Sequence, residues 1–269
     1  MKTCVDIGGT KVLVAQVDDE GKIVYSKKEP TPKDYSDFME LLGKMLDKLT
    51  LDDSVVVVGA PGKINREKGE VIKFGNLPWE NAPIKADLKK ITGKRVILEN
   101  DANLAALGEH WSLSEKPEQS LYITVSTGIG TGVVTEGVLD PHHIDSEGGE
   151  MLIEHNGKLD TWEHIASGKA IVEKYGVRAS ELDSETAWHD VCHVLAIGII
   201  NLLTVLEPGI IIIGGGVGSH FTKFEHTLLQ QLDELKPPLV DIPPIVQASR
   251  PEEAVILGCY RLSLQSEGT

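Results

Sequence analysis

The sequence predicts an α/β protein built from two similar lobes, and three observations lead to this fold class. Apolar runs rich in β-branched residues alternate with segments whose apolar residues recur at helical spacing. A pair of predicted strands around a turn of glycine and threonine occurs early in each half, as "DIGGTK" and "STGIGTG". The 269 residues, 41% of them hydrophobic, are enough for one large core or two smaller ones. Two α/β lobes with a cleft between them are the simplest assembly.

The first half is expected to open with three strands and to continue with alternating helices and strands. The run "SVVVVGAPG" is continuous in β-branched residues, as in strands buried on both faces of a sheet. Gly93 is a suitable stop for the short helix that precedes it. The predicted elements are strands 3–9, 10–18 and 22–30, helix 35–50, strand 54–62, helix 82–93 and strand 94–100.

The second half is expected to repeat this arrangement with little sequence identity. Two strands and their glycine-rich turn span 120–139, and four consecutive isoleucines predict a buried strand within 209–218. Pro251 is expected in the first turn of a terminal helix, where its missing amide proton does no harm. The remaining predicted elements are helices 161–176, 186–208, 221–235 and 251–265 and strand 243–249.

Composition excludes some classes of function. The 41 acidic and 26 basic residues give a net charge of -15, which repels phosphate backbones and anionic membranes, so we expect no nucleic-acid or membrane partner. No apolar run approaches the roughly 20 residues that span a membrane, and "MKTCVDIGG" lacks the apolar stretch of a signal peptide. Cys4, Cys192 and Cys259 form no CxxC pair and are expected to be core residues. We therefore expect a soluble, cytoplasmic protein.

The glycine turns are candidate phosphate sites, because glycine lets backbone amides turn toward a ligand and consecutive inward amides bind anions. Neither turn matches the GxxxxGK[ST] loop or a strand-to-helix GxGxxG, since a strand follows each. For either turn alone an ordinary hairpin is an equally good explanation, but two at corresponding points favour binding. The candidates are Asp6, Gly8, Gly9, Thr10 and Lys11 in the first turn and Thr127, Gly128 and Gly130 in the second.

A third glycine cluster, Gly214, Gly215 and Gly216, ends the isoleucine strand. Its bare backbone suits a flat group lying against it, although a tight turn before a helix is the simpler alternative.

The segment "LENDANLAALGE" places Asn100 and Asp101 between a strand and an Ala/Leu-rich helix. Asn and Asp are good helix N-caps, but the carboxyl end of a strand is also where α/β proteins place catalytic groups. Among the many glutamates, Glu150 beside two glycines and Glu163 within an apolar stretch are the better candidates. Four histidines lie between 142 and 164, but their spacing fits no usual zinc pattern, so zinc is not expected.

These motifs together carry a family resemblance. "VDIGGTKVLVAQVD", "ILENDANLAALGE", "STGIGTGVV", "GGEM", "WEHIASG" and "IIIIGGGV" follow one another in the order seen in sugar kinases of the ROK family. The chain from Cys4 to about Leu262 resembles these kinases, which belong to the actin-like ATPase superfamily. The resemblance implies two actin-like lobes of mixed sheets flanked by helices. Their expected limits are a small lobe 1–107 with sugar-site elements, a larger lobe 108–250 with the nucleotide site, and a helix 251–269 returning to the small lobe.

The resemblance also implies roles for the candidate residues. Both glycine turns would hold the phosphates of ATP, Asp6 would hold Mg²⁺ through waters, and the Gly214–Gly216 cluster would lie beside the adenosine. Asp101 would be the general base at the hydroxyl that is phosphorylated. The residues that would bind sugar hydroxyls are Asn76, Asn100, Asp101, Glu150 and Glu163.

One motif departs from the family pattern. Many ROK kinases carry ExGH and a cysteine-rich zinc loop, but here Ile153 stands where that histidine is expected, and "NGKLDTWEH" has no cysteine. His155 could replace the missing histidine only if the loop is rearranged. Losing one donor to a buried hydroxyl costs about 1–3 kcal/mol, so the sugar is the least determined part of the prediction.

The function implied is ATP- and Mg²⁺-dependent phosphorylation of a hexose at its 6-hydroxyl, with glucose the default sugar. N-acetylmannosamine, fructose and allose are alternative substrates. A non-catalytic, sugar-sensing ROK protein and a sugar-independent ATPase are alternatives of another class. ROK repressors carry a helix-turn-helix before the first glycine turn, and a turn beginning at Asp6 leaves no room for one. A homodimer is expected from the family resemblance alone.

Overall fold

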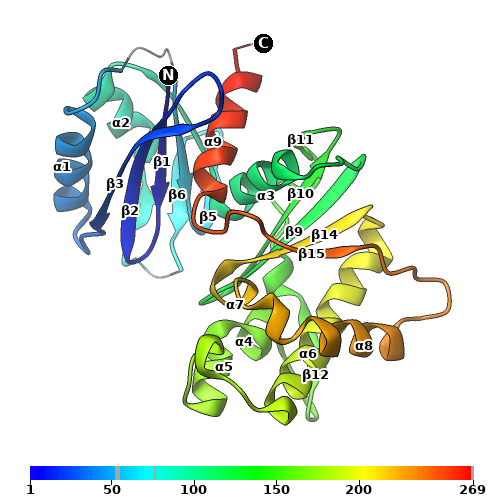
Figure 1. Ribbon diagram of the computed structural model, residues 1–269. Coiled ribbons are helices and arrows are strands. Elements are labelled where there is room, and N and C mark those ends of the chain that lie inside the picture. The colour runs from blue at the N-terminus through cyan, green and yellow to red at the C-terminus, as the bar shows by residue number, and fades with distance from the viewer. Residues whose placement is uncertain (52–54, 76, 268–269) are drawn as a thin grey trace. The chain divides into compact units, whose positions relative to one another are not determined.

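The computed structural model describes residues 1–51, 55–75 and 77–267. The chain forms two compact units, one of Met1–Gly108 with Glu252–Thr269 and one of Glu109–Pro251. Each unit is a mixed α/β structure with its own five-stranded sheet, as Figure 1 shows. The predicted α/β class is confirmed, and the units are described separately below.

The sheet of the first unit has the strand order β3-β2-β1-β4-β8. Its first three strands form an antiparallel meander, whereas β1, β4 and β8 run parallel. Parallel strands end at the same edge of a sheet, so the ends of β1 and β8 bring Asp6 and Asn100 to one edge. The strands are β1 (Lys2–Ile7), β2 (Lys11–Val17), β3 (Ile23–Pro30), β4 (Val55–Ala60) and β8 (Arg95–Asn100).

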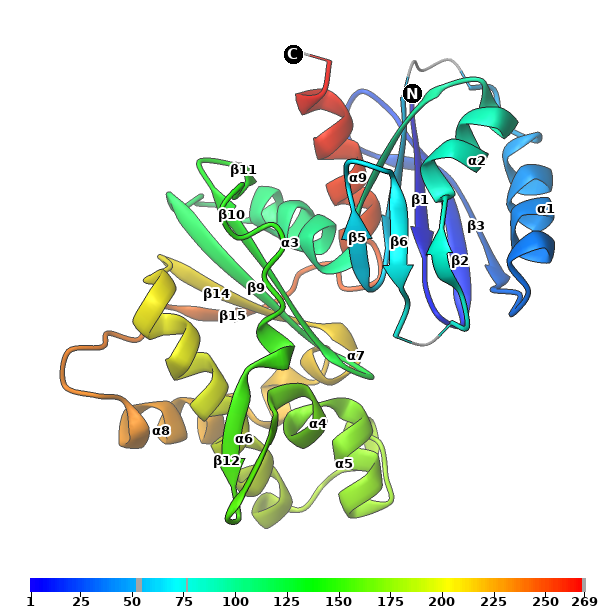
Figure 2. The ribbon, with the colours of Figure 1, turned by 180° about the vertical axis from the view of Figure 1, so that it is seen from behind.

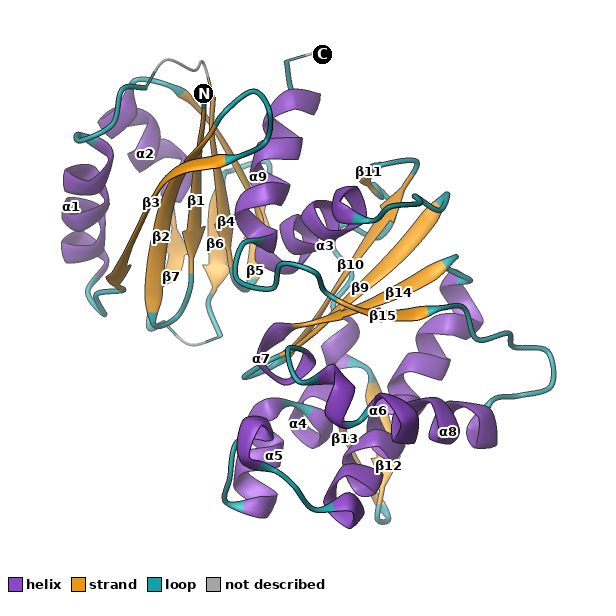
Figure 3. Ribbon diagram, in the orientation of Figure 1, coloured by secondary structure: helices purple, strands orange, loops and turns teal. Residues whose placement is uncertain are grey.

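Helices cover both faces of this sheet, as Figures 1 and 3 show. Alternate strand residues point to opposite faces, so Val5 packs in the cluster with α1 and α2, and Cys4 in the cluster with α3 and α9. Asp34 caps α1 by accepting two backbone N–H groups, and Gly93 ends α2 in the left-handed conformation, as its position predicted. The helices are α1 (Tyr35–Leu46), α2 (Ile84–Thr92), α3 (Asp101–Ser112) and α9 (Ala254–Gln265).

A small three-stranded sheet in the first unit was not predicted from the sequence. It consists of β5 (Lys63–Asn65), β6 (Glu70–Lys73) and β7 (Glu80–Ala82), and Figure 2 shows β5 and β6. Strands of three or four residues are too short to show a period, although Ile64 and Val71 are buried in the α1–α2 cluster.

The sheet of the second unit has the strand order β11-β10-β9-β14-β15. The predicted hairpin around the second glycine turn is confirmed as β9 and β10, and β14 runs parallel to β9. A separate hairpin, β12 with β13, follows the short 3₁₀ helix η1 (Gly148–Glu150). The strands are β9 (Gln119–Val125), β10 (Ile129–Thr135), β11 (Val138–Leu139), β12 (Leu152–His155), β13 (Lys158–Thr161), β14 (Ile210–Gly214) and β15 (Ile245–Gln247).

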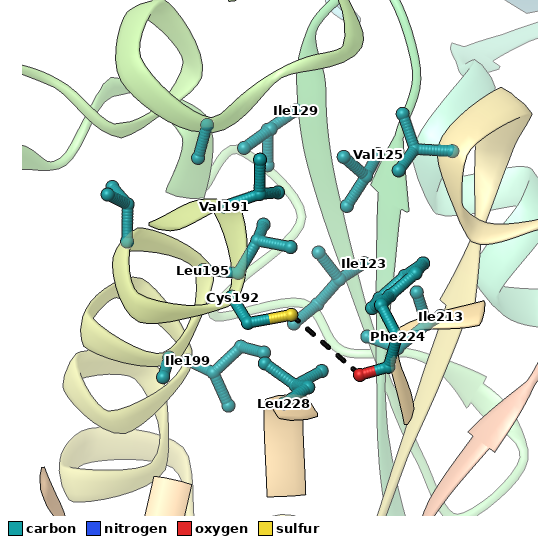
Figure 4. Close-up of a cluster of buried hydrophobic side chains, with 14 of the residues drawn as sticks. Ile123, Val125, Ile129, Val191, Cys192, Leu195, Ile199, Ile213, Phe224 and Leu228 are labelled. Carbon is teal, nitrogen blue, oxygen red and sulfur yellow. Dashed lines mark hydrogen bonds between the residues drawn. The ribbon is translucent and has the colours of Figure 1, made fainter. Parts of the chain in front are cut away.

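The core of the second unit forms where α6 and α8 pack on this sheet. Figure 4 shows side chains of α6 meeting those of β9 and β14, with the Cys192 thiol 3.7 Å from the carbonyl oxygen of Phe224. Burial raises the pKa of Cys192 to about 12, and all three cysteines are buried, as expected. The helices are α4 (Trp162–Ala166), α5 (Gly168–Tyr175), η2 (Ala179–Glu181), α6 (Glu185–Leu206), α7 (Gly215–Gly218), η3 (Phe221–Lys223) and α8 (Glu225–Leu235).

Three local expectations were wrong. The helix predicted over 161–176 is two helices, because Ser167 is extended and its hydroxyl caps α5. The helix predicted over 221–235 begins with a 3₁₀ turn, and Pro251 lies in a turn before α9. The 22 residues of α6 are long and apolar enough to cross a membrane by length and composition alone. Much of its apolar surface packs inside the unit, and Figure 4 shows Val191, Cys192, Leu195 and Ile199 of α6 in the core.

Candidate active site

The corner between β8 and α3 holds the predicted general base. The side-chain oxygen of Asn100 accepts the backbone N–H groups of Ala102 at 2.9 Å and Asn103 at 3.2 Å, so Asn100 is the N-cap of α3. Its amide nitrogen donates to the carbonyl oxygen of Gly62 at 3.2 Å. Asp101 is the first residue of α3 and is half-buried. The two explanations of "ENDAN", helix capping and catalysis, therefore apply to different residues. Asn100 is the cap, and Asp101 is the candidate base.

A second carboxyl group lies near this corner. Burial and, to a smaller extent, the negative charge of Asp101 raise the pKa of Asp6 from 3.8 to about 7, and the positive charge of Lys28 partly opposes them. The last residues of β1 thus place Asp6 within electrostatic reach of Asp101 in the same unit. Two neighbouring carboxylates in a partly desolvated position are stabilised by a bound cation, as in sites for Mg²⁺.

The first glycine turn exposes its amides. The carbonyl oxygens of Gly8 and Thr10 accept hydrogen bonds from Thr31, at 2.8 and 2.9 Å, and Lys33 donates to that of Gly9 at 3.3 Å. The N–H of Gly8 donates to the carbonyl oxygen of Lys11 within the turn, at 2.9 Å. A Cβ on Gly8 would lie only 2.8 Å from the same carbonyl oxygen. Within residues 1–51, 55–75 and 77–267 the amides of Gly9 and Thr10 have no protein acceptor. They suit an external anion.

The second glycine turn is held by the motif "WEHIASG". One carboxylate oxygen of Glu163 accepts the N–H of Ile129 at 2.8 Å, and the N–H of Gly168 donates to the carbonyl oxygen of Ser126 at 2.6 Å. A Cβ on Gly128 would lie 2.2 Å from that carboxylate, so a larger residue there would displace the side chain of Glu163. The structure therefore places Glu163, predicted as a sugar ligand, against the turn that contains Thr127, Gly128 and Gly130.

The motif "GGEM" packs on the same strand, β10. The N–H of Gly148 donates to the hydroxyl of Thr131 at 3.2 Å, and a Cβ on Gly149 would lie 2.1 Å from the carbonyl oxygen of Ile129. Glu150, the next residue, is exposed. Two motifs that are separate in sequence thus meet at one turn of the second unit.

The three residues of the third glycine cluster, Gly214, Gly215 and Gly216, differ in their surroundings. A Cβ on Gly214 would lie 2.2 Å from the hydroxyl of Tyr122, and Gly215 has a φ of 81°. These two glycines are explained by packing and backbone conformation. A Cβ on Gly216 would meet nothing within 4 Å, so Gly216 is the member that borders open space.

The position of the missing histidine is part of the core. Ile153 is 3% exposed and packs in the hydrophobic core of the second unit. His155 lines a cavity of about 400 Å³ that also borders Asp160, His164 and Asp190. None of the predicted site residues lines this cavity. Among the described residues no group of three or more His, Cys, Asp or Glu side chains is arranged to hold a metal ion.

Two predicted site residues remain to be located, and two residues near the site were not predicted. Asn76, predicted to bind sugar, lies outside the described residues, and Lys11 lies at the start of β2. Sequence analysis missed Glu99 and Arg66, which are paired behind the β8–α3 corner. A charged residue inside the apolar strand "RVILEN" was the available signal for Glu99, but nothing marks Arg66 in the sequence.

Comparison with known proteins identifies relatives over the whole chain. The chain is 33% identical to a glucokinase of Streptomyces coelicolor over 187 residues, which are 65% of this chain. It spans only 59% of the length of that glucokinase. It is also 29% identical to a glucokinase of Thermotoga maritima, over 94% of each protein, and 27% identical to an N-acetyl-D-glucosamine kinase of Yersinia pseudotuberculosis, over 84% of this chain and 87% of that kinase.

The fold agrees with these relatives. A ROK family glucokinase from Streptomyces griseus, solved in complex with glucose and AMPPNP, superposes with a TM-score of 0.82 at 22% identity, over 98% of this chain and 99% of the other. The family model described as "ROK family" matches residues 2–265. The chain belongs to the ROK family.

Proposed function

We propose that this protein is an ATP-dependent sugar kinase that phosphorylates the 6-hydroxyl of a hexose, with glucose the first sugar to test. The observation that carries the proposal is Asp101, presented at a strand end beside Asn100 and within electrostatic reach of Asp6. Support comes from the relatives, which include glucokinases and an N-acetyl-D-glucosamine kinase, and from the ATP analogue and glucose named in one related structure.

The proposed chemistry needs one proton acceptor and several contacts that hold the sugar. A sugar hydroxyl is a weak nucleophile, so a carboxylate that accepts its proton helps the hydroxyl oxygen to bond to the γ-phosphorus while the bond from this phosphorus to the bridging oxygen breaks and ADP leaves. Asp101 is that acceptor, and Asn100 binds a neighbouring hydroxyl without adding negative charge near the phosphate. Glu150 and Glu163 are the proposed contacts to hydroxyls elsewhere on the ring. Asn76 is the further proposed sugar contact, as the family resemblance implies.

Phosphate binding is proposed for the glycine turns. The amides of Gly9 and Thr10 in one unit, and of Thr127 and Gly128 in the other, have no protein acceptor in the part of the chain that the structure describes. Lys11 is the proposed cationic contact, and Gly214, Gly215 and Gly216 are the proposed contacts to adenosine. Asp6 would hold Mg²⁺ through waters, and when bound this ion neutralises the charge that develops on the phosphate oxygens.

A panel of sugars tests the proposal. Purified protein is assayed with ATP and Mg²⁺ for sugar-dependent release of ADP, using glucose, N-acetylglucosamine, N-acetylmannosamine, fructose and allose. We expect one of these to be preferred, with product phosphorylated at the 6-hydroxyl by NMR. ADP release that no sugar accelerates would contradict the proposal and favour a sugar-independent ATPase. Sugar binding without any ADP release would favour a sugar sensor.

A further inference from the structure

Glu99 is a buried carboxylate directly behind the proposed base. Its residue is 4% exposed, and it lies in β8 between Leu98 and Asn100. An ionised carboxylate is rarely buried without partners, because it loses its hydration. Glu99 is therefore expected to be kept there by specific contacts.

Those contacts come from two directions. Arg66, in the turn after β5, donates from Nε to one oxygen of Glu99 at 2.8 Å and from Nη2 to the other at 2.5 Å. The second oxygen, Oε1, also accepts the backbone N–H of Asn100 at 2.7 Å and the side-chain amide of Asn103 at 3.0 Å. Arg66 thus compensates the negative charge of Glu99, and the other hydrogen bonds that Glu99 accepts come from the β8–α3 corner.

The two acceptor contacts lie on either side of Asp101. Asn100 precedes it, and Asn103 is two residues further along α3. Asn100 in turn caps α3 and donates to Gly62, so a rotation of its peptide would move the helix start as well. Glu99 therefore contacts the backbone just before Asp101 and a side chain two residues after it.

We infer that Glu99, charge-compensated by Arg66, is a positioning residue for Asp101 in the proposed kinase reaction. The effect on kcat expected from this inference rests on the proposed function. Proton transfer from a hydroxyl needs a base held within hydrogen-bond distance, and a displacement of about 1 Å lowers rates by about 100-fold.

The test uses graded variants. Glu99→Gln keeps the volume and one acceptor oxygen but loses the charge, and Arg66→Met removes the guanidinium. Arg66→Lys keeps a charge without the two-pronged geometry. The control is Lys2→Gln, which breaks the ion pair between Lys2, the first residue of β1, and Glu267 at 2.5 Å. Like the Arg66–Glu99 pair, it joins one buried and one partly exposed side chain.

We expect Glu99→Gln and Arg66→Met to lower kcat about 10- to 100-fold, with KM for sugar and ATP changed less than about 3-fold. Arg66→Lys should recover part of the loss, and the double variant should be no worse than the poorer single one, because both remove one interaction. Lys2→Gln should lower the melting temperature and leave kcat near wild type. Losses no larger than that of Lys2→Gln, or losses confined to KM, would overturn the inference.

A second readout separates this inference from the proposed function. Hydrogen exchange at the amides of residues 100–103 should be faster in Glu99→Gln than in wild type, and unchanged in Lys2→Gln. Unchanged exchange in Glu99→Gln would overturn the inference even in an active kinase. Wild-type protein that phosphorylates no sugar would instead overturn the proposed function, and the exchange data would still report on the corner. Because Glu99→Gln and Arg66→Lys preserve volume or charge, they serve if Arg66→Met fails to fold.

Discussion

Replacing Asp6 by Asn should stabilise the ligand-free protein at alkaline pH while it abolishes activity. Burial and the nearby charge of Asp101 raise the pKa of Asp6 from 3.8 to about 7. Between these two values the folded state binds a proton that the unfolded chain has released, so stability falls as the pH rises. Above pH 7 the full cost of this partly buried charge is present. Asn cannot ionise and does not incur it.

The size of the effect follows from the shift. A pKa raised from 3.8 to about 7 corresponds to a cost of about 4 kcal/mol at pH 8 and about 1.7 kcal/mol at pH 5. Structural relaxation and water entry reduce such costs, so these figures are upper values. The gain in unfolding free energy on Asp6→Asn should be larger at pH 8 than at pH 5 by up to about 2–3 kcal/mol.

Urea unfolding followed by circular dichroism at pH 5 and pH 8, with EDTA present, measures this difference. The control is Asp241→Asn, the same change at an exposed position, whose effect should be small and equal at both pH values. The dependence of free energy on urea should be unchanged in both variants, so that the midpoints can be compared. A gain that is the same at both pH values, or a loss at pH 8, would refute the burial argument.

Three further changes test individual contacts. Glu163→Ala removes the acceptor of the Ile129 amide and should raise the KM for ATP several-fold above that of Glu163→Gln, which keeps an acceptor oxygen. Because Glu163 is also a proposed sugar contact, ATP is varied at saturating sugar, and equal KM values for ATP in the two variants would contradict the prediction. Gly214→Ala should lower stability by about 1–3 kcal/mol, because its Cβ would meet Tyr122, whereas Gly216→Ala should not, and thermal melts of the pair decide the point. Glu109, 2% exposed, accepts three hydrogen bonds from residues 249 and 250, so Glu109→Ala should cost about 2–4 kcal/mol in urea unfolding, and a cost below about 1 kcal/mol would show that these bonds are replaceable.

Periodicity and turn residues were sufficient to predict most of the fold. The β-branched runs became β4 and β14, and both glycine turns connect antiparallel strands as predicted. The short strands β5–β7 were missed because three or four residues carry no period. Ser167 broke a predicted helix because its hydroxyl caps the next one, a choice that propensity over the whole segment does not reveal.

The site was predictable only where residues adjacent in sequence act together. Asn100 and Asp101 could be found because the strand end, the cap and the candidate base are consecutive. The pairing of Arg66 with Glu99 joins residues 33 positions apart, and the contact of Glu163 with Ile129 joins residues 34 apart. Such contacts depend on tertiary packing, which no local pattern encodes.

The central claim is that Asp101 takes the proton from the sugar hydroxyl. The most direct measurement compares Asp101→Asn with wild type for kcat on the preferred sugar and for sugar affinity by calorimetry. Asp37→Asn, an acidic residue in the first turn of α1, is the matched control. We predict that Asp101→Asn lowers kcat by about 10²- to 10⁴-fold and leaves the sugar Kd within a few-fold of wild type. A variant that retains wild-type kcat would contradict the account.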